Sequence, residues 1–352
     1  MPSQKRYRVL LTCLGDKPLR KDMQQVCEEA GLKVVRPHAG RSHPLSSADL
    51  CEEIRGFGPF HAFVTGMDEV DAAAIQCASK SLQGDLFLGI HRPGVGYDRI
   101  DCDAARQFRC PVTITNGSNH RVVAQMTLGL MLAVLHRFRE GMVSVDAWDW
   151  EHRPTGNILE EKCWGIIGCG RIGEALAKLL IPHGLKILLY DPKRKDLAVV
   201  AAGLDAACKE GLYATAGSSV GLCSDLHALL PQSQCLSVHV PLTGNENLLD
   251  ADALGLLPDG AAVVNTARGG IVNEEAMAVE LRRERLRYGA DVFVGEFKAT
   301  KPPLLGLPGF LGTPHICSLN EVGPRQMAWA FRNLAAVARG EVPKSYVVGP
   351  FE

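Results

Sequence analysis

Three glycines in one stretch have the spacing of a loop that binds phosphate groups. Gly168, Gly170 and Gly173 follow an apolar run and open a helix-like segment, residues 171–180. Gly168 permits a tight strand-to-helix turn, Gly170 lets the backbone approach a pyrophosphate, and Gly173 lets helix and strand pack closely. The free N–H groups and the dipole at the helix start then face the phosphates. The stretch predicts a dinucleotide-binding turn.

A carboxylate follows at the position that decides which dinucleotide binds. The next apolar run, residues 186–190, stops on Asp191, 18 residues after Gly173. A carboxylate there accepts the ribose hydroxyls and repels a 2′-phosphate, so Asp191 favours NAD over NADP. Lys193, Arg194 and Lys195 come directly after it and leave the preference open. A glycine-rich turn without function and a methyltransferase loop are the alternatives, and the strand, helix and distal acid argue against both.

Three later segments each place a reactive side chain beside a predicted strand end. Arg268 precedes Gly269-Gly270, Glu296 ends the segment that begins at Gly289, and His315 follows Pro314. Ligands of open α/β sheets bind at the carboxyl ends of the strands. A guanidinium, a carboxylate and an imidazole together could bind a 2-oxo acid and protonate its carbonyl oxygen.

The elements that position these groups alternate between strand and helix, which predicts parallel sheets wrapped by helices. We expect an α/β protein with two flavodoxin-like or Rossmann-like, doubly wound domains and an active-site cleft between them. The first domain, residues 1–118 plus 316–352, is expected to bind substrate. The second, residues 119–315, is expected to bind the dinucleotide. In the first part the predicted strands are 8–13, 33–35, 60–65 and 86–90, and the predicted helices are 19–30, 47–55 and 101–108.

A long apolar segment, residues 120–139, predicts one buried helix that crosses to the second domain. Residues 203–221 are rich in alanine, glycine and serine and predict a loop, and residues 302–314 predict another extended connection. The last helix, 322–339, is expected to fold back on the first domain. The other predicted strands are 164–167, 186–190, 235–240, 261–265 and 287–292, and the other predicted helices are 171–180, 250–256 and 273–284.

Composition excludes several kinds of partner. The 352 residues suffice for two domains, and a formal net charge of −1 gives no electrostatic footprint for nucleic acid or an anionic membrane. No apolar run approaches the length of a membrane span, and the start of the chain has no signal-peptide core, so a cytoplasmic protein is expected. The twelve cysteines are scattered singly, without metal-site spacing, and predict reduced thiols and no metal.

Taken together, these segments resemble the D-isomer-specific 2-hydroxyacid dehydrogenases, over roughly residues 86 to 320. Besides the glycine turn and the three strand-end segments, the resemblance rests on Gly94-Val-Gly-Tyr-Asp98 and on His239-Val-Pro-Leu-Thr243. Arg92-Pro93-Gly94 is similar to the basic lead-in of the phosphoglycerate dehydrogenase branch, here without a regulatory domain. Phe297 departs from the family, which usually has proline after the glutamate.

The resemblance implies a role for each reactive residue. Arg268 would bind the substrate carboxylate and polarise its carbonyl, because a planar fork of donors suits a carboxylate. His315 would be the general acid in reduction and the base in oxidation. Glu296 would hydrogen-bond His315 and hold the orientation of its ring. Arg92 and the backbone N–H groups of Val95 and Gly96 would bind substrate.

The same resemblance implies a set of contacts to the cofactor NAD. Asp291 would receive the nicotinamide carboxamide, and the segment from His239 would line the cofactor cleft. The full set expected to bind NAD is Gly168, Gly170, Arg171, Ile172, Gly173, Asp191, His239, Pro241, Thr266, Ala267 and Asp291.

The implied protein is a homodimeric NAD-dependent oxidoreductase that interconverts a D-2-hydroxy acid and its 2-oxo acid by hydride transfer at C2. Formate dehydrogenase shares this scaffold but is expected to carry glutamine in place of Glu296. A corepressor-like protein that senses NADH on the same scaffold is the alternative from another class. The sequence names neither the physiological acid nor the direction of the reaction.

Overall fold

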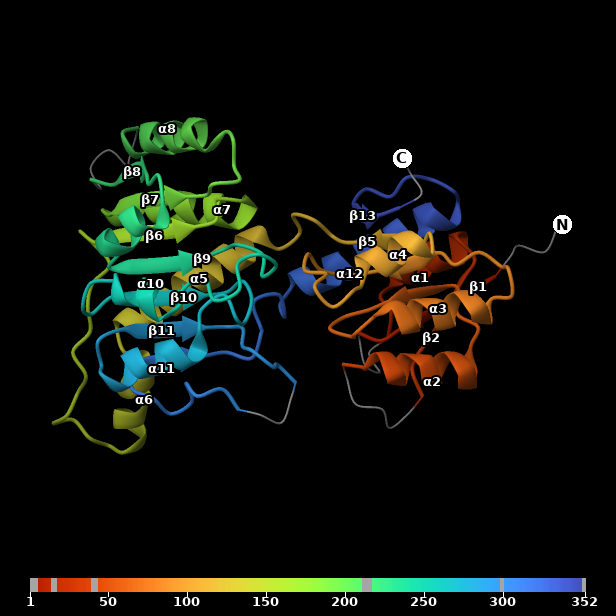
Figure 1. Cartoon of the computed structure of the whole chain (residues 1–352), viewed down its shortest axis with the longest axis horizontal. Coiled ribbons are helices and arrows are strands. Elements are labelled where there is room, and N and C mark those ends of the chain that lie inside the picture. The colour runs from red at the N-terminus through yellow and green to blue at the C-terminus, as the bar shows by residue number, and fades with distance from the viewer. Residues whose placement is uncertain (1–5, 14–17, 39–43, 211–216, 298–300, 350–352) are drawn as a thin grey trace. The chain divides into compact units, whose positions relative to one another are not determined.

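The computed structural model describes residues 6–13, 18–38, 44–210, 217–297 and 301–349, and the chain divides into two compact units (Figure 1). Unit 1 consists of Met1–Asn119 and Glu321–Glu352, and unit 2 of His120–Asn320. The sequence predicts the two divisions after residues 118 and 315. The second division between the units therefore lies five residues later in the structure than predicted, beyond the turn that carries His315.

Unit 1 contains a six-stranded sheet in the order β13-β5-β4-β3-β1-β2. Only β13 runs antiparallel to its neighbour, and the order of the parallel strands is that of flavodoxin-like sheets. The strands are β1 (Tyr7–Leu11), β2 (Leu32–Val35), β3 (Ala62–Val64), β4 (Gly89–His91), β5 (Val112–Thr113) and β13 (Tyr346–Val348).

Three helices of unit 1 begin where a side chain caps their free N–H groups. Ser46 and Asp49 form a reciprocal capping box, and Asp71 and Asp101 each accept a backbone N–H of the following turn. Phe331 belongs to the buried cluster that holds Val9 and Leu11, so the last helix folds back on unit 1 as predicted. The helices are α1 (Lys21–Glu29), α2 (Ser47–Phe57), α3 (Ala72–Ser81), α4 (Cys102–Gln107) and α12 (Val322–Ala338).

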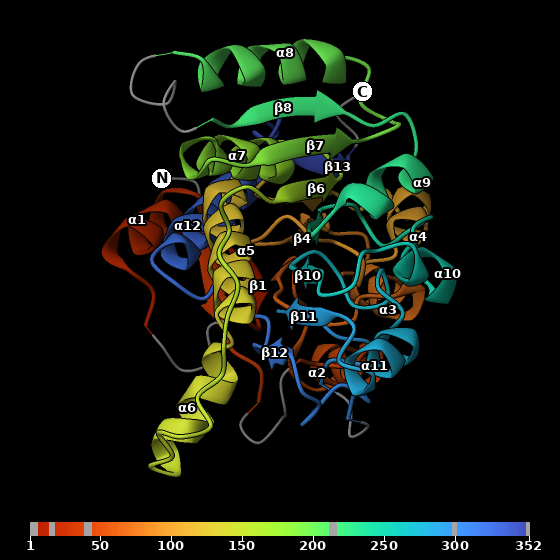
Figure 2. The same ribbon diagram turned by 90° about the vertical axis from the view of Figure 1, so that its left-hand side faces the viewer.

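Unit 2 contains a seven-stranded, fully parallel sheet in the order β12-β11-β10-β9-β6-β7-β8 (Figure 2). The order reverses beside β6, as in the Rossmann fold, where ligands bind at the carboxyl ends of the strands at the reversal. The strands are β6 (Cys163–Ile167), β7 (Lys186–Tyr190), β8 (Ser219–Leu222), β9 (Cys235–Val238), β10 (Ala262–Asn265), β11 (Arg287–Ala290) and β12 (Phe310–Gly312).

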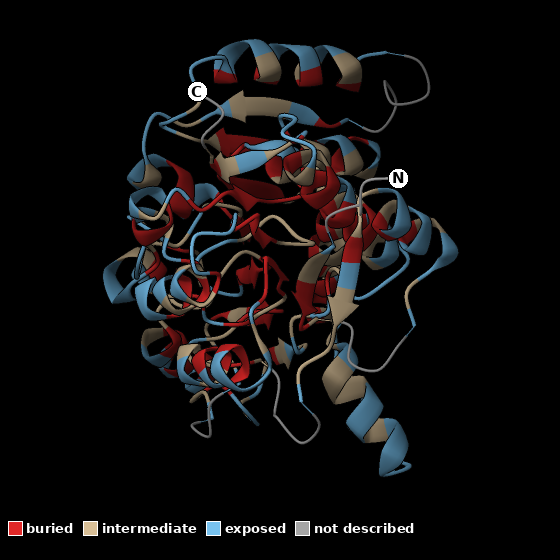
Figure 3. Ribbon diagram, turned by 90° about the vertical axis from the view of Figure 1, so that its right-hand side faces the viewer, coloured by how far each residue is buried: buried red, intermediate tan, exposed pale blue. Residues whose placement is uncertain are grey.

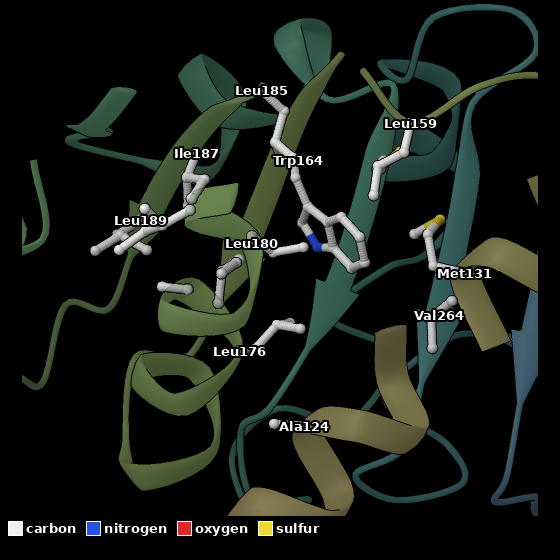
Figure 4. Close-up of a cluster of buried hydrophobic side chains, with 14 of the residues drawn as sticks. Ala124, Met131, Leu159, Trp164, Leu176, Leu180, Leu185, Ile187, Leu189 and Val264 are labelled. Carbon is white, nitrogen blue, oxygen red and sulfur yellow. The ribbon is translucent and has the colours of Figure 1, made fainter. Parts of the chain in front are cut away.

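Trp164 in β6 is a centre of the hydrophobic core of unit 2. Its fully buried indole lies among side chains of the neighbouring strands and helices, including Leu176, Leu180 and Ile187 (Figure 4). Its Nε1–H donates to Ser237 Oγ at 2.9 Å, so the buried polar atom is satisfied. The helices of unit 2 are α5 (His120–Leu135), α6 (Phe138–Asp146), α7 (Arg171–Leu180), α8 (Leu197–Cys208), α9 (Leu226–Leu229), α10 (Ala251–Gly255) and α11 (Glu274–Arg282).

Three sequence predictions were wrong. The connection predicted over 302–314 contains the strand β12 (Phe310–Gly312), which pairs with β11 at the edge of the sheet. The helix predicted over 120–139 ends at Leu135, because Arg137 adopts a left-handed conformation (φ 55°) that breaks it before α6. The loop predicted over 203–221 is helical as far as Cys208 in α8 and joins β8 at Ser219; residues 211–216 lie outside the described residues. Its alanines are strong helix formers, and Gly203 is tolerated inside the helix.

Buried residues lie mainly in the sheets and on the helix faces that pack against them. The strands of both sheets are mostly buried, and exposed residues lie on the outer faces of the helices (Figure 3). All twelve cysteines are free thiols. Within the described ranges, no helix combines the length and the apolar character that a membrane crossing requires.

Candidate active site

The glycine turn lies at the point where the strand order of unit 2 reverses. Gly168 has φ 86°, and a Cβ on it would lie 2.8 Å from the carbonyl carbon of His239, which directly follows β9. A Cβ on Gly173 would lie 2.2 Å from Gly168 O. Both positions therefore require glycine, for the two reasons that the sequence predicted.

The surroundings of Gly170 fit a bound pyrophosphate. A Cβ built on Gly170 has no described atom within 4 Å, so the backbone is open to a ligand at this point. No side chain among the described residues caps the start of α7, and its first N–H groups remain available for an anion. Arg171 and Ile172 form this first turn, with Arg171 exposed and Ile172 half-buried.

A buried donor beside the turn gives a second sign that the site fits a dinucleotide. His239 Nε2 lies 3.0 Å from Ser237 Oγ, while Nδ1 is buried without a hydrogen-bond partner in the described part of the chain. Since Ser237 Oγ already accepts from Trp164, its hydroxyl can donate to Nε2, and Nδ1 then carries the hydrogen. Burial lowers the pKa of His239 to about 3, so the ring is neutral and presents one unfilled donor.

Asp191 directly follows β7 and is held by the chain itself. Its Oδ2 accepts from Cys169 N at 2.9 Å and its Oδ1 from Lys193 N at 3.0 Å. Each carboxylate oxygen can accept a further hydrogen bond. The carboxylate is thus fixed against the glycine turn, with capacity left for hydroxyl donors.

Arg268 lies in a tight turn after β10. Asn265 spans this turn, because its Nδ2 donates to Arg268 O at 2.8 Å and its Oδ1 accepts from Ala267 N at 3.0 Å. The half-buried Arg268 donates from Nη1 to Ala267 O at 2.6 Å. A Cβ on Gly269 would lie 2.0 Å from the carbonyl carbon of Phe293, so the arginine turn packs directly on the segment that leads to Glu296.

Glu296 and His315 are in contact. The Glu296 Oε2 atom lies 2.8 Å from His315 Nδ1, and Oε1 accepts from Phe293 N at 2.9 Å. The glutamate is therefore fixed at both oxygens, and His315 Nε2 is the ring nitrogen left for a substrate. Phe297, which replaces the usual proline, has φ 66° and is exposed, and the contact forms nevertheless.

Asp291 holds the turn that carries His315. This fully buried carboxylate accepts from Thr313 Oγ1 at 2.6 Å, from Ile316 N at 2.8 Å and from Cys317 N at 3.0 Å. His315 itself has φ 54°, an uncommon conformation for a non-glycine residue, and donates its N–H to Asp291 O at 2.8 Å. Contact of Asp291 with a carboxamide stays a prediction.

The other predicted contacts divide between the two units. Thr266 Oγ1 is 2.8 Å from Thr127 Oγ1 on α5, and Pro241 is exposed in the segment after β9. Arg92, Val95 and Gly96 lie in unit 1, directly after β4. In the described part of the chain, the N–H groups of Val95 and Gly96 donate to no acceptor.

A hollow of about 740 Å³ opens beside the His315–Glu296 pair. Its wall includes Phe293 and Phe310 from the strand ends and Met142 from α6. The volume is in the range of small-molecule sites. The His315–Glu296 pair is thus accessible from outside unit 2.

Two residues of this site were missed from the sequence. Asn265, which shapes the arginine turn, ends a buried strand, where asparagine is uncommon, and this could have indicated its role. The buried Glu274 accepts from Val294 N at 2.7 Å. Nothing in the sequence indicated it, because acidic residues are common in first helical turns.

The Rossmann-type sheet, the open glycine turn and the imidazole–carboxylate pair at one strand edge define a dinucleotide-dependent oxidoreductase. A model described as "D-isomer specific 2-hydroxyacid dehydrogenase, NAD binding domain" matches residues 128–317. A glyoxylate reductase of Thermofilum pendens is 31% identical over 97% of this chain and 94% of its own length. The chain belongs to the D-isomer specific 2-hydroxyacid dehydrogenase family.

Two further comparisons agree. A hydroxypyruvate reductase of Thermotoga maritima is 32% identical over 70% of this chain and 78% of its own length. The crystal structure of the TT0316 protein from Thermus thermophilus superposes with a TM-score of 0.78 at 30% identity, covering 97% of this chain and all of that one. The predicted family, fold class and NAD cofactor are confirmed, and the protein is an NAD-dependent oxidoreductase of 2-hydroxy and 2-oxo acids.

Proposed function

We propose that the protein interconverts a small D-2-hydroxy acid and its 2-oxo acid, with Arg268, Glu296 and His315 as its catalytic residues. The 2.8 Å contact between His315 Nδ1 and Glu296 Oε2 carries this proposal, because it leaves Nε2 as the proton-transferring atom. NAD supplies the hydride chemistry at C2. In reduction, His315 donates a proton from Nε2 to the carbonyl oxygen, and Glu296 balances the charge of the protonated ring.

Arg268 is the residue proposed to bind the substrate carboxylate and polarise the carbonyl. Its backbone is held by the turn that Asn265 spans, and its guanidinium offers a fork of donors that matches a carboxylate. The successive N–H groups of Val95 and Gly96 and the side chain of Arg92, all in unit 1, are the further groups proposed to bind substrate. Consecutive backbone N–H groups without an internal acceptor suit an anionic ligand.

The names of the relatives point to the substrate class. Two of the similar proteins are named glyoxylate reductase and hydroxypyruvate reductase. We therefore expect turnover of short 2-oxo acids, and a panel of glyoxylate, hydroxypyruvate, pyruvate and phosphohydroxypyruvate with NADH ranks them by kcat/KM. Tight NADH binding without turnover of any 2-oxo acid would favour the corepressor-like sensor.

His315→Ala tests the assigned mechanism. We expect kcat to fall by about two to four decades while NADH still binds, because proton transfer by a positioned side chain contributes on that scale. NADH binding is followed by the quenching of protein fluorescence. Near-normal turnover in this variant would remove His315 from the mechanism.

A homodimer is proposed from the surface of α6. This helix buries none of its residues and stands out from the rest of unit 2 in Figure 2. Phe138, Met142 and Val143 on it are more than half exposed, as are Trp148 and Trp150 just after it. A contiguous apolar surface of this kind marks a protein interface. Sedimentation of the protein and of Met142→Glu tests it: the wild type should sediment as a dimer and the variant as a monomer.

A further inference from the structure

The three cations that follow Asp191 differ in their environment. Lys193 and Lys195 are exposed, whereas Arg194 keeps only 20% of its side chain accessible. In Rossmann folds an arginine near this carboxylate is the group that accommodates a 2′-phosphate. The state of Arg194 therefore bears on the choice between NAD and NADP.

Every nitrogen of the Arg194 guanidinium is already engaged. Nε lies 3.0 Å from Asp196 Oδ1, and Nη2 lies 3.0 Å from Glu174 Oε2 and 3.3 Å from Asp196 Oδ2. Nη1 donates to the backbone carbonyl of Cys169 in the glycine turn. Each nitrogen of the planar fork thus has at least one acceptor, and these acceptors are two carboxylates and one backbone carbonyl of unit 2.

Glu174 is well placed to hold the arginine. It lies in the first turn of α7, and its N–H donates to Gly170 O at 3.0 Å. Its other oxygen, Oε1, lies 2.7 Å from Lys178 Nζ, and this hydrogen bond lowers the pKa of Glu174, with Arg194 acting in the same direction. The carboxylate therefore remains ionised at neutral pH and keeps its charge against Arg194.

We propose that Glu174 and Asp196 are specificity-determining residues that hold Arg194 against the glycine turn and so exclude NADP. This inference rests on the proposed ribose-binding role of Asp191. A 2′-phosphate would have to draw Arg194 away from two carboxylates and the Cys169 carbonyl, and would also meet the charge of Asp191. NAD needs no such rearrangement, because ribose hydroxyls donate to Asp191 and make no demand on Arg194.

The test measures binding, not turnover. The dissociation constants of NADH and NADPH are determined by fluorescence, and those of 5′-AMP and adenosine 2′,5′-bisphosphate by calorimetry. The proteins are the wild type, the double variant Glu174→Gln/Asp196→Asn, and the same double variant with Arg194→Gln. Glu341→Gln in unit 1 is the matched control, because Glu341 forms a comparable exposed pair with Arg339 at 2.7 Å. Circular dichroism establishes that each variant is folded.

The wild type should bind NADH more tightly than NADPH. In the double variant the ratio of the NADPH to the NADH dissociation constant should fall about tenfold, equivalent to about 1.4 kcal/mol. Adenosine 2′,5′-bisphosphate should gain affinity by a similar factor while 5′-AMP does not. Adding Arg194→Gln should abolish the gain, because the freed guanidinium is what binds the phosphate.

Two outcomes would overturn the proposal: a wild type that already binds NADPH as tightly as NADH, or a folded double variant with an unchanged ratio. A different result would contradict the proposed ribose contact of Asp191. If Asp191→Ala leaves the affinity for NADH and the ratio unchanged, the ribose contact is wrong, whatever the Arg194 variants show.

Discussion

His315 Nδ1 and Glu296 Oε2 lie 2.8 Å apart although the two residues stand on different loops, 19 positions apart in the chain. Each of the two residues is also held by a contact with another part of the chain. Glu296 is held by the Phe293 N–H, and the backbone around His315 is held by Asp291. The pair is therefore held in place by contacts within the chain, which is what proton transfer in a defined direction requires.

Glu296→Gln should lower kcat by about tenfold to a hundredfold and leave NADH affinity unchanged. The amide keeps a hydrogen-bonding group beside His315 but removes the charge that balances the protonated ring. The measurement is steady-state kinetics with the best 2-oxo acid. Asp149→Asn is the matched control, since Asp149 Oδ2 lies 2.9 Å from His152 Nδ1 in an exposed pair, and it should have no effect. Equal kcat values in wild type and Glu296→Gln would show that the carboxylate charge is irrelevant.

Glu274→Ala should lower kcat about tenfold with little change in NADH affinity. The buried Glu274 holds Val294 N, one residue along from the N–H that holds Glu296. Loss of this carboxylate releases residues 293–294, which set the position of Glu296. Glu274→Gln keeps an acceptor for Val294 N and should restore most of the activity, and the exposed neighbour Glu275 provides the control Glu275→Gln. If Glu274→Ala is as active as this control, Glu274 has no positioning role.

The sequence predicted the elements around the glycine turn more fully than the contacts around His315. Helix α7 and strand β7 begin and end at the predicted residues. The glycine turn marks the start of α7, and the change from apolar residues to Asp191 marks the end of β7. The pairing of Glu296 with His315 is a tertiary contact between loops, and only the family resemblance suggested it. The Arg194 contacts were beyond prediction for the same reason, since spacing does not show which carboxylate a cation meets.

The ends of two helices were mispredicted from the residues around them. The break at Arg137 depends on a left-handed backbone at a residue that rarely adopts one, and no glycine or proline announced it. Residues 203–208 were grouped with the glycine- and serine-containing stretch that follows them, yet their alanines favour a helix and they continue α8, which packs on the sheet. The buried side chains that anchor α8 there are Leu197, Ala201, Leu204 and Cys208.

Gly269→Ala should reduce both activity and stability. A Cβ there would lie 2.0 Å from the carbonyl carbon of Phe293, which is backbone and cannot turn aside, so the arginine turn and the glutamate segment must separate. We expect a loss of about 1–3 kcal/mol in the free energy of unfolding, the usual cost of overpacking, and a loss of kcat/KM. Urea unfolding and kinetics measure the two effects.

Gly203→Ala is the control for this substitution. A Cβ on Gly203 has no described atom within 4 Å, and the residue lies inside α8. Alanine there should be neutral or stabilise the protein by up to about 1 kcal/mol. Similar losses from both substitutions would mean that the close approach of Gly269 to Phe293 is not the cause.

Unit 1 should lose stability as the pH falls below 7, because of His91. This residue is fully buried at the end of β4, with Nε2 3.1 Å from Leu88 O and Nδ1 2.8 Å from Thr113 Oγ1. Since Leu88 O only accepts, Nε2 carries the hydrogen and Nδ1 accepts from Thr113, which satisfies the neutral ring. Burial lowers the pKa of His91 from 6.5 to about 3.

The direction of this pH dependence follows from proton binding. Between pH 6.5 and about 3 the unfolded chain binds a proton at His91 that the folded unit does not, so stability rises with pH across this window and is lost on acidification. At pH 5 the loss from this one residue is about 2 kcal/mol. Hydrogen exchange of the β4 and β5 amides at pH 7 and pH 5 measures it, after correction for intrinsic exchange rates. His91→Gln should reduce the difference by about this amount, whereas His152→Gln, at an exposed histidine, should not; equal pH dependence in the two variants would exclude His91 as the cause.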